Sequence, residues 1–321
     1  MSFKELFLSK YKETLFTRYD EDGSVFYFSP SDFPGLSAVE YSFTNNHGER
    51  LKGYFYNYDA PIENRIVIFE HGLGGGHRAY MREIELLARH GYLVYSYDRG
   101  GCMESEGETT HGFSASLSDL DACIRALKAD ENYKGYSISV VGHSWGGFST
   151  MNISAIHNDV QHAVAISGFS SVNNIHKQIT GTLFASMRKY LYDVEYKANP
   201  DYVDFSAIEN LKTTSTKTLI IHSNDDKVVK CSHHFKRLRK AAKKNQNVYF
   251  LLVKGKGHNP NYTFDAVKYK DAFFKELTKK KKLGLLNTEE QKAAFRNSYD
   301  WRRMTEQDEH VWDVIFEMLA E

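Results

Sequence analysis

The sequence predicts an α/β protein with a mostly parallel, doubly wound sheet, and three observations support this prediction. Short apolar runs rich in β-branched residues alternate along the chain with segments of helical spacing. Glycine-rich or polar clusters directly follow several of these runs. The chain has 321 residues, 41% of them hydrophobic, which allows a large domain with a sizeable core. Strands that alternate with helices in this way form right-handed crossovers and a parallel sheet.

The predicted elements begin with a short helix over residues 4–16. Two strands with alternating polarity, at 39–44 and 51–58, enclose the turn sequence Asn-His-Gly-Glu, and we expect them to form an antiparallel edge of the sheet. Buried strands are predicted at 66–69, 92–97, 137–141, 163–167, 218–221 and 248–253. Helices are predicted at 80–89, 114–129, 148–156, 229–244 and 264–277.

The alternation stops between residues 168 and 215. Residues 173–191 carry an amphipathic apolar stripe there, which predicts a helical cap inserted over the carboxyl edge of the sheet. We therefore divide the chain into a core of residues 1–167 and 216–283, a cap of residues 168–215, and a C-terminal helical extension of residues 284–321. The extension has no functional interpretation in the sequence.

Composition excludes several kinds of partner. The formal net charge is zero, which gives no electrostatic reason to expect nucleic acid. No apolar run is long enough for stable membrane insertion, and residues 1–18 lack a signal-peptide core. Three cysteines without paired spacing favour a reducing compartment. We expect a cytoplasmic enzyme for a small-molecule substrate, with no metal or cofactor; the oligomeric state stays open.

The pentapeptide Gly142-His143-Ser144-Trp145-Gly146 lies between a predicted strand and a predicted helix. A serine hydroxyl is a useful nucleophile only if it stands clear of its backbone, and a sharp strand-to-helix turn achieves this. Glycines two residues to either side allow the tight packing that such a turn needs. The pattern alone is weak, because it recurs by chance. It gains weight from the order of the residues that follow.

An acid and a base follow Ser144 in chain order, each after a predicted strand. Asp225 and Asp226 come after the strand at 218–221, and we favour Asp226 because it lies further along the turn, whereas Asp225 could cap it. His258 lies in a glycine-containing loop after the strand at 248–253. We expect His143 to face elsewhere in its tight turn. These positions suit a nucleophile, an orienting acid and a general base.

Acyl transfer also needs donors for the developing oxyanion. We expect one backbone N–H from Trp145, beside the nucleophile at the helix start. The second is expected from Leu73, because Gly72 and Gly74 let that loop turn back toward the serine. The loop lacks the Gly-Lys-Ser/Thr ending of a nucleotide-binding loop and the spacing of a dinucleotide fingerprint, which argues against phosphate binding.

Together these motifs resemble the α/β-hydrolase fold superfamily, and most closely its esterase, monoacylglycerol-lipase and serine-aminopeptidase-like branch. The likeness spans about residues 40–277 and rests on a few motifs: His71-Gly72-Leu73-Gly74-Gly75, Asp98-Arg99-Gly100-Gly101, Ser105-Glu106-Gly107, Gly142 to Gly146, Asp226 before Val229, and Gly257-His258. The resemblance implies an α/β-hydrolase fold in which Ser144 is the nucleophile, His258 the base and then the acid, and Asp226 the residue that orients the imidazole.

The leading hypothesis is a serine hydrolase that cleaves a carboxylic ester or a thioester through an acyl-enzyme on Ser144. One alternative is an aminopeptidase or amidase, which would need cap acids to hold an α-ammonium group; Asp193, Glu195, Asp201 and Asp204 are available. Another is a non-catalytic binding protein on the same fold. Apolar residues of the cap could line an acyl pocket, or could simply pack the cap onto the core: Phe169, Ile175, Ile179, Leu183, Phe184 and Met187.

Overall fold

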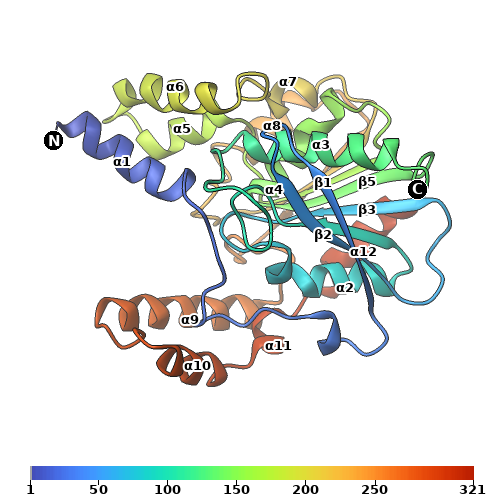
Figure 1. The fold of residues 1–321 in the computed structure, drawn as a ribbon. Coiled ribbons are helices and arrows are strands. Elements are labelled where there is room, and N and C mark those ends of the chain that lie inside the picture. The colour runs from blue at the N-terminus through green and yellow to red at the C-terminus, as the bar shows by residue number, and fades with distance from the viewer. Residues whose placement is uncertain (1) are drawn as a thin grey trace.

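An eight-stranded sheet forms the centre of the molecule in the computed structural model, which describes residues 2–321 (Figure 1). The strand order is β1-β2-β4-β3-β5-β6-β7-β8. β1 pairs antiparallel with β2 and β2 with β4, and the remaining neighbours are parallel. The predicted sheet with an antiparallel N-terminal edge is confirmed. The strands are β1 (Ser37–Thr44), β2 (Arg50–Asn57), β3 (Arg65–Glu70), β4 (Leu93–Tyr97), β5 (Ser137–His143), β6 (His162–Ile166), β7 (Lys217–Ser223) and β8 (Val248–Val253).

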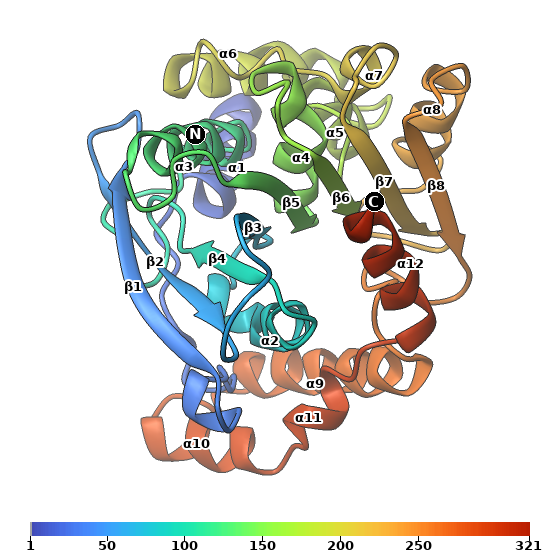
Figure 2. The same ribbon diagram turned by 90° about the vertical axis from the view of Figure 1, so that its right-hand side faces the viewer.

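Helices flank the sheet on both faces (Figure 2). They are α1 (Phe3–Leu15), α2 (Met81–Arg89), α3 (Ala115–Ala129), α4 (Trp145–Asn152), α5 (Val172–Thr180), α6 (Arg188–Ala198), α7 (Ala207–Asn210), α8 (Phe235–Ala241), α9 (Phe264–Lys282), α10 (Glu289–Asn297), α11 (Trp301–Met304) and α12 (Glu309–Ala320). The helix predicted over 229–244 is shorter than expected. Its first residues form a turn instead, because Asp226 accepts the backbone N–H groups of Val228 and Val229.

The two faces of the sheet bury different hydrophobic clusters. Ile66 and Ile68 of β3 belong to one cluster, which includes residues of α3 and α4. Val67 and Phe69 belong to another, which includes residues of α2 and α12. This division follows from the alternation of side chains along a strand. Because β3 is covered on both faces, its sequence is a continuous apolar run rather than an alternating one.

Residues 168–215, predicted as a helical cap, contain two longer helices and one short one. α5 is followed at its C-terminus by the capping residue Gly181, whose φ of 54° glycine adopts without strain. A 3-10 turn, Ala185–Met187, then leads into α6. α1 lies beside α5 and α6 (Figure 1), although we assigned it to the core. The Tyr11 hydroxyl of α1 donates to Glu195 of α6 over 2.5 Å, and Phe3 stacks on Phe184.

The C-terminal residues form a helix that packs against one face of the sheet. Trp312, Ile315 and Leu319 of α12 are at most 1% exposed and belong to the same cluster as Val67 and Phe69. This last helix therefore contributes directly to the packing of one sheet face. Across residues 2–321, no helix is both long enough and apolar enough to cross a bilayer.

Candidate active site

Ser144 lies at the sharp turn between β5 and α4, as predicted. Its φ of 57° is unusual for a residue with a side chain, and such strain is often found at functional sites. Both flanking glycines are required by close packing. A Cβ at Gly142 would lie 2.4 Å from Thr150 Oγ1, and one at Gly146 would lie 2.2 Å from the Glu70 carbonyl oxygen. The turn thus depends on the glycines that the pentapeptide supplies.

A continuous chain of hydrogen bonds links Ser144, His258 and Asp226. Ser144 Oγ lies 2.8 Å from His258 Nε2, and His258 Nδ1 lies 2.8 Å from Asp226 Oδ2. Because an ionised carboxylate can only accept, Nδ1 carries the ring proton of a neutral His258, and Nε2 accepts from the serine hydroxyl. The three residues come from the ends of β5, β7 and β8, which meet at one edge of the sheet.

Asp225 and Asp226 have different surroundings. Asp226 is 5% exposed, and its Oδ1 accepts the N–H groups of Val228 and Val229 at 2.8 and 2.9 Å, which leaves Oδ2 free for His258. Asp225 is exposed and accepts from the Ser223 hydroxyl and the Gly257 N–H. Asp225 therefore serves the loop backbone, as the capping alternative expected, and the geometry favours Asp226 as the partner of the imidazole.

The loop after β3 lies against the serine. A Cβ at Gly72, the residue before Leu73, would lie 3.4 Å from Ser144 Cβ. Within residues 2–321, neither Leu73 nor Trp145 donates its N–H to a backbone carbonyl. For Trp145 this follows from its position as the first residue of α4. Neither N–H is therefore engaged by the backbone of the described residues, which an oxyanion donor would require.

His143 does not simply face away from the site, contrary to our expectation. Its Nε2 lies 2.8 Å from the backbone oxygen of His258, and its Nδ1 lies 2.9 Å from the Tyr80 hydroxyl. Burial lowers the pKa of His143 well below its ordinary value, so the ring is neutral. A carbonyl can only accept, so Nε2–H donates to His258 and Nδ1 accepts from Tyr80. His143 therefore orients the backbone of the loop that carries His258.

His222 is a second buried histidine that sequence reasoning missed. Its Nε2 lies 2.7 Å from the Val229 carbonyl oxygen and 3.4 Å from Asp226 Oδ2. Burial lowers its pKa, so His222 is a neutral donor beneath the acid-bearing turn. Its position at the end of a buried strand is the one sequence signal that it offered, and fourteen histidines in the chain obscure that signal.

The six cap residues proposed for an acyl pocket do not share one surface. Phe169 and Ile175 are 2% and 5% exposed and pack within the large core cluster. Phe184 packs on Phe3 and Phe7 of α1. Ile179 and Leu183 are 45% and 82% exposed, and Met187 is half-buried. For Phe169, Ile175 and Phe184, packing of the cap is the better description.

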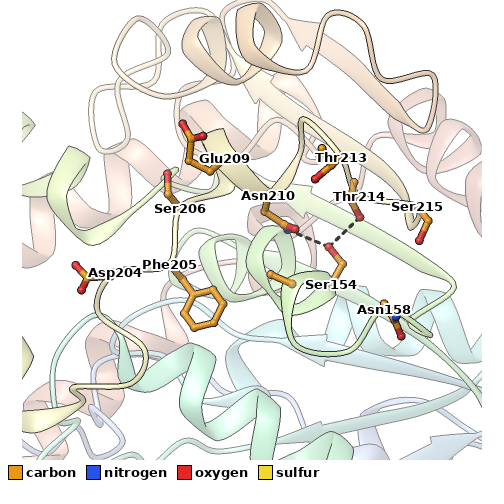
Figure 3. Close-up of a pocket in the computed structure, with 11 residues that line it drawn as sticks. Ser154, Asn158, Asp204, Phe205, Ser206, Glu209, Asn210, Thr213, Thr214 and Ser215 are labelled. Atoms are coloured by element: carbon orange, nitrogen blue, oxygen red, sulfur yellow. Dashed lines mark hydrogen bonds between the residues drawn. The ribbon is translucent and has the colours of Figure 1, made fainter.

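A cleft of about 530 Å³, shown in Figure 3, is lined by none of the six cap residues. Among its lining residues, Asn210 and Thr214 both donate hydrogen bonds to Ser154 Oγ. Its lining includes none of Ser144, Asp226 or His258. In the described part of the chain, no group of three or more His, Cys, Asp or Glu side chains has an arrangement that could hold a metal ion.

The stability of the folded chain is expected to fall as the pH is lowered from 7.5 to 5.5. Burial holds the pKa of these histidines below the ordinary value: His71 (to about 3), His143, His176 (to about 3), His222 and His234 (to about 3). Below about pH 6.5 the unfolded chain takes up protons that the folded chain does not. Each such histidine lowers the free energy of unfolding by up to about 1.4 kcal/mol per pH unit.

Buried carboxyl groups act in the opposite direction, because burial raises their pKa and the folded chain then binds the extra proton: Glu83, Asp119 (to about 6) and Glu195. The five histidines outnumber them, so a net loss of stability is expected. Urea unfolding at pH 7.5, 6.5 and 5.5 measures it. Equal or greater stability at pH 5.5 would contradict the expectation.

The fold, with its strand ends meeting at Ser144, is that of the α/β-hydrolase superfamily, as its motifs suggested. A sequence model of the prolyl oligopeptidase family matches residues 79–281, which is more than half of the chain. The chain belongs to the prolyl oligopeptidase family, and hydrolase is the class of enzyme that this membership supports. The matched segment contains Ser144, Asp226 and His258, and it ends before α10.

Curated relatives include alpha/beta hydrolase domain-containing protein 17C of Mus musculus and of Homo sapiens. Each is 25% identical to the chain over 232 residues, which cover 70% of this chain. The aligned region spans 63% of the mouse protein and 62% of the human protein, less than two thirds of either.

Solved structures show the same fold at low sequence identity. An esterase from Pyrococcus furiosus is 20% identical, with a TM-score of 0.59 over 84% of this chain and 97% of that one. An acylaminoacyl peptidase from Pyrococcus horikoshii is 17% identical, with a TM-score of 0.55 over 71% of this chain and 38% of that one. Ester and peptide hydrolases are thus both found on this fold.

Proposed function

We propose that the chain is a serine hydrolase that cleaves a carboxylic ester or a thioester through an acyl-enzyme on Ser144. One observation carries the proposal: the unbroken hydrogen-bonded series from Asp226 Oδ2 through both ring nitrogens of His258 to Ser144 Oγ. A nucleophile, a base and an orienting acid in hydrogen-bond contact are what nucleophilic catalysis by serine requires.

In this mechanism Ser144 Oγ attacks the acyl carbon while its proton passes to His258 Nε2. The negative charge that develops on the acyl oxygen is stabilised by the N–H groups of Leu73 and Trp145. His258 then gives the proton to the leaving alkoxide or thiolate, and the acyl group stays on Ser144. A water molecule attacks the acyl-enzyme, His258 accepts its proton, and the acid is released as Ser144 Oγ recovers that proton. Asp226 stabilises the imidazolium in both halves of the reaction.

An aminopeptidase or amidase is the second candidate, and membership of the prolyl oligopeptidase family favours it. The cap acids give it limited support. Glu195 is fully buried and accepts from the Tyr11 hydroxyl, from the Phe113 N–H and from both donors of Ser114. Its oxygens are thus already occupied by the protein. Asp204 accepts from the Tyr192 hydroxyl. Neither Glu195 nor Asp204 therefore offers a free, buried carboxylate for the α-ammonium group of a substrate.

A panel of p-nitrophenyl esters with acyl chains of increasing length, tested beside aminoacyl p-nitroanilides, distinguishes the two functions. We expect saturable hydrolysis of at least one ester, and no dependence of anilide cleavage on a free α-amino group. Ser144→Ala serves as the control for uncatalysed hydrolysis. Efficient cleavage of anilides that is lost when the α-amine is acetylated, together with weak ester hydrolysis, would reject the esterase in favour of the aminopeptidase.

A further inference from the structure

The loop after β8 that carries His258, here called the histidine loop, has an unusual composition for a loop that must hold a reactive side chain still. Gly255 and Gly257, with φ of 72° and 54°, lie on either side of Lys256. Glycines lose more conformational freedom on ordering than other residues, so such a loop needs strong tertiary contacts to stay in one conformation. The contacts of the loop show what supplies them.

Lys256 extends from this loop into the protein rather than into solvent. Its side chain is 2% exposed, and its ammonium group forms an ion pair with the Asp308 carboxylate. The backbone N–H of Lys256 donates to Ser223 Oγ over 3.1 Å, at the turn before Asp226. Lys256 therefore ties the histidine loop to the acid-bearing turn on one side and to the C-terminal part of the chain on the other. A buried ammonium group is strongly destabilised without such a partner.

Residues 305–308, here called the C-terminal strap, run against the chain that follows His258. Asp308 N–H donates to the Asn261 carbonyl over 2.8 Å, and Thr263 N–H donates to the Glu306 carbonyl over 3.0 Å. Tyr262 and Gln307 form an antiparallel bridge between these two bonds. In Figures 1 and 2 the chain passes from α11 to α12 beside one end of α9. The strap thus pairs with the segment that leads from His258 into α9.

Side chains reinforce this pairing. The Asn261 amide donates to Gln307 Oε1 over 2.9 Å and to the buried carboxylate of Glu83 over 3.2 Å. Gln307 Oε1 also accepts from the indole N–H of Trp312 over 2.8 Å. Because Trp312 is 1% exposed in the core beside α2, the strap is anchored to the sheet as well as to the loop.

We infer that Gln307 and Asp308 are positioning residues for His258: the strap holds the histidine loop through Lys256, Asn261 and Thr263, at the distance from Ser144 that proton transfer needs. The inference rests on the proposed role of His258. It gives the C-terminal extension a function, although this segment lies outside the matched region of the family. A displacement of about 1 Å at a reacting group costs on the order of 10²-fold in rate, so a loosened loop is costly even when the fold persists.

Asp308→Asn tests the inference, because asparagine can still accept the Val311 N–H as the N-cap of α12 while the charge opposite Lys256 is lost. Asp300→Asn is the matched control, since it removes the charge of the exposed N-cap of α11, which makes no contact with Lys256. We expect Asp308→Asn to lower kcat for an ester about 10- to 100-fold with KM within about twofold, and Asp300→Asn to leave both near wild type.

Hydrogen exchange provides a readout that does not depend on activity. Backbone amides of residues 254–263 should exchange faster in Asp308→Asn than in Asp300→Asn, with the strands of the sheet unchanged. In Asp308→Asn the buried ammonium group of Lys256 has no charged partner, and the single variant could fold poorly for that reason alone. The double variant Lys256→Met, Asp308→Asn removes that ammonium group and so provides a second test. This variant is expected to fold, to show the same faster exchange and to keep the low kcat.

Two results would overturn the inference. One is a kcat for both Asp308 variants within about twofold of Asp300→Asn; the other is unchanged exchange of residues 254–263. If the wild type instead hydrolyses no ester and resists serine-directed reagents, the proposed function fails. The exchange measurement then decides whether the strap holds the loop.

Discussion

Ser144→Ala is expected to lower kcat for ester hydrolysis by about 10⁶-fold. The substitution removes the atom that would form the acyl-enzyme, and only the oxyanion donors and substrate binding remain. His258→Ala is expected to cost about as much, because the serine then has no base 2.8 Å from its hydroxyl. Residues that act as one unit are not additive, so the double variant should be no slower than either single variant.

Steady-state kinetics on a p-nitrophenyl ester measure these losses, with thermal unfolding to establish that each variant is folded. Purification of the variants on fresh resin is essential, since a trace of wild type would mask a loss of this size. Independent effects, in which the double variant is slower by the product of the two single losses, would mean that Ser144 and His258 do not act together.

Asp226→Asn is expected to lower kcat by about 10⁴-fold, and Asp225→Asn by less than about tenfold. Asp226 Oδ2 accepts the Nδ1 proton of His258 and thereby directs the lone pair of Nε2 toward Ser144. An asparagine amide can donate to Nδ1 instead, which favours the tautomer with its proton on Nε2 and leaves no base for the serine. Asp225 accepts from Ser223 and Gly257, so its loss affects only the loop.

The two variants are matched in chemistry and adjacent in sequence, which makes each a control for the other. Their kcat values on the same ester, measured between pH 6 and 9, give the comparison directly. A larger loss for Asp225→Asn would assign the orienting role to Asp225 and would contradict the geometry of the two carboxylates.

Much of the candidate site could be predicted because strand order determines where loops meet. Ser144, Asp226 and His258 each follow a strand that is recognisable as a short apolar run, and the carboxyl ends of parallel strands share one edge of the sheet. The flanking glycines gave a further signal, because Gly142 and Gly146 pack too tightly for any side chain. The antiparallel edge formed by β1 and β2 was predictable from the alternating polarity of the two strands and from the turn sequence between them.

Contacts between distant parts of the chain could not be predicted in this way. The partnership of Lys256 with Asp308 spans 52 residues, and neither residue differs locally from a surface residue. The role of His143 depends on Tyr80, which lies 63 residues away. The two readings of the cap stripe also needed distant contacts: helical periodicity identifies which side chains are apolar, but not that Phe184 packs against Phe3 and Phe7 of α1.

The most direct test of Ser144 as the nucleophile is covalent labelling with an alkyl fluorophosphonate, followed by mass spectrometry of the intact protein and of its peptides. We expect one adduct per chain, on the peptide that contains Ser144, and none on Ser144→Ala. Pre-incubation with an ester that is hydrolysed should slow the labelling. An adduct on any other residue, or equal labelling of Ser144→Ala, would contradict the assignment of this serine.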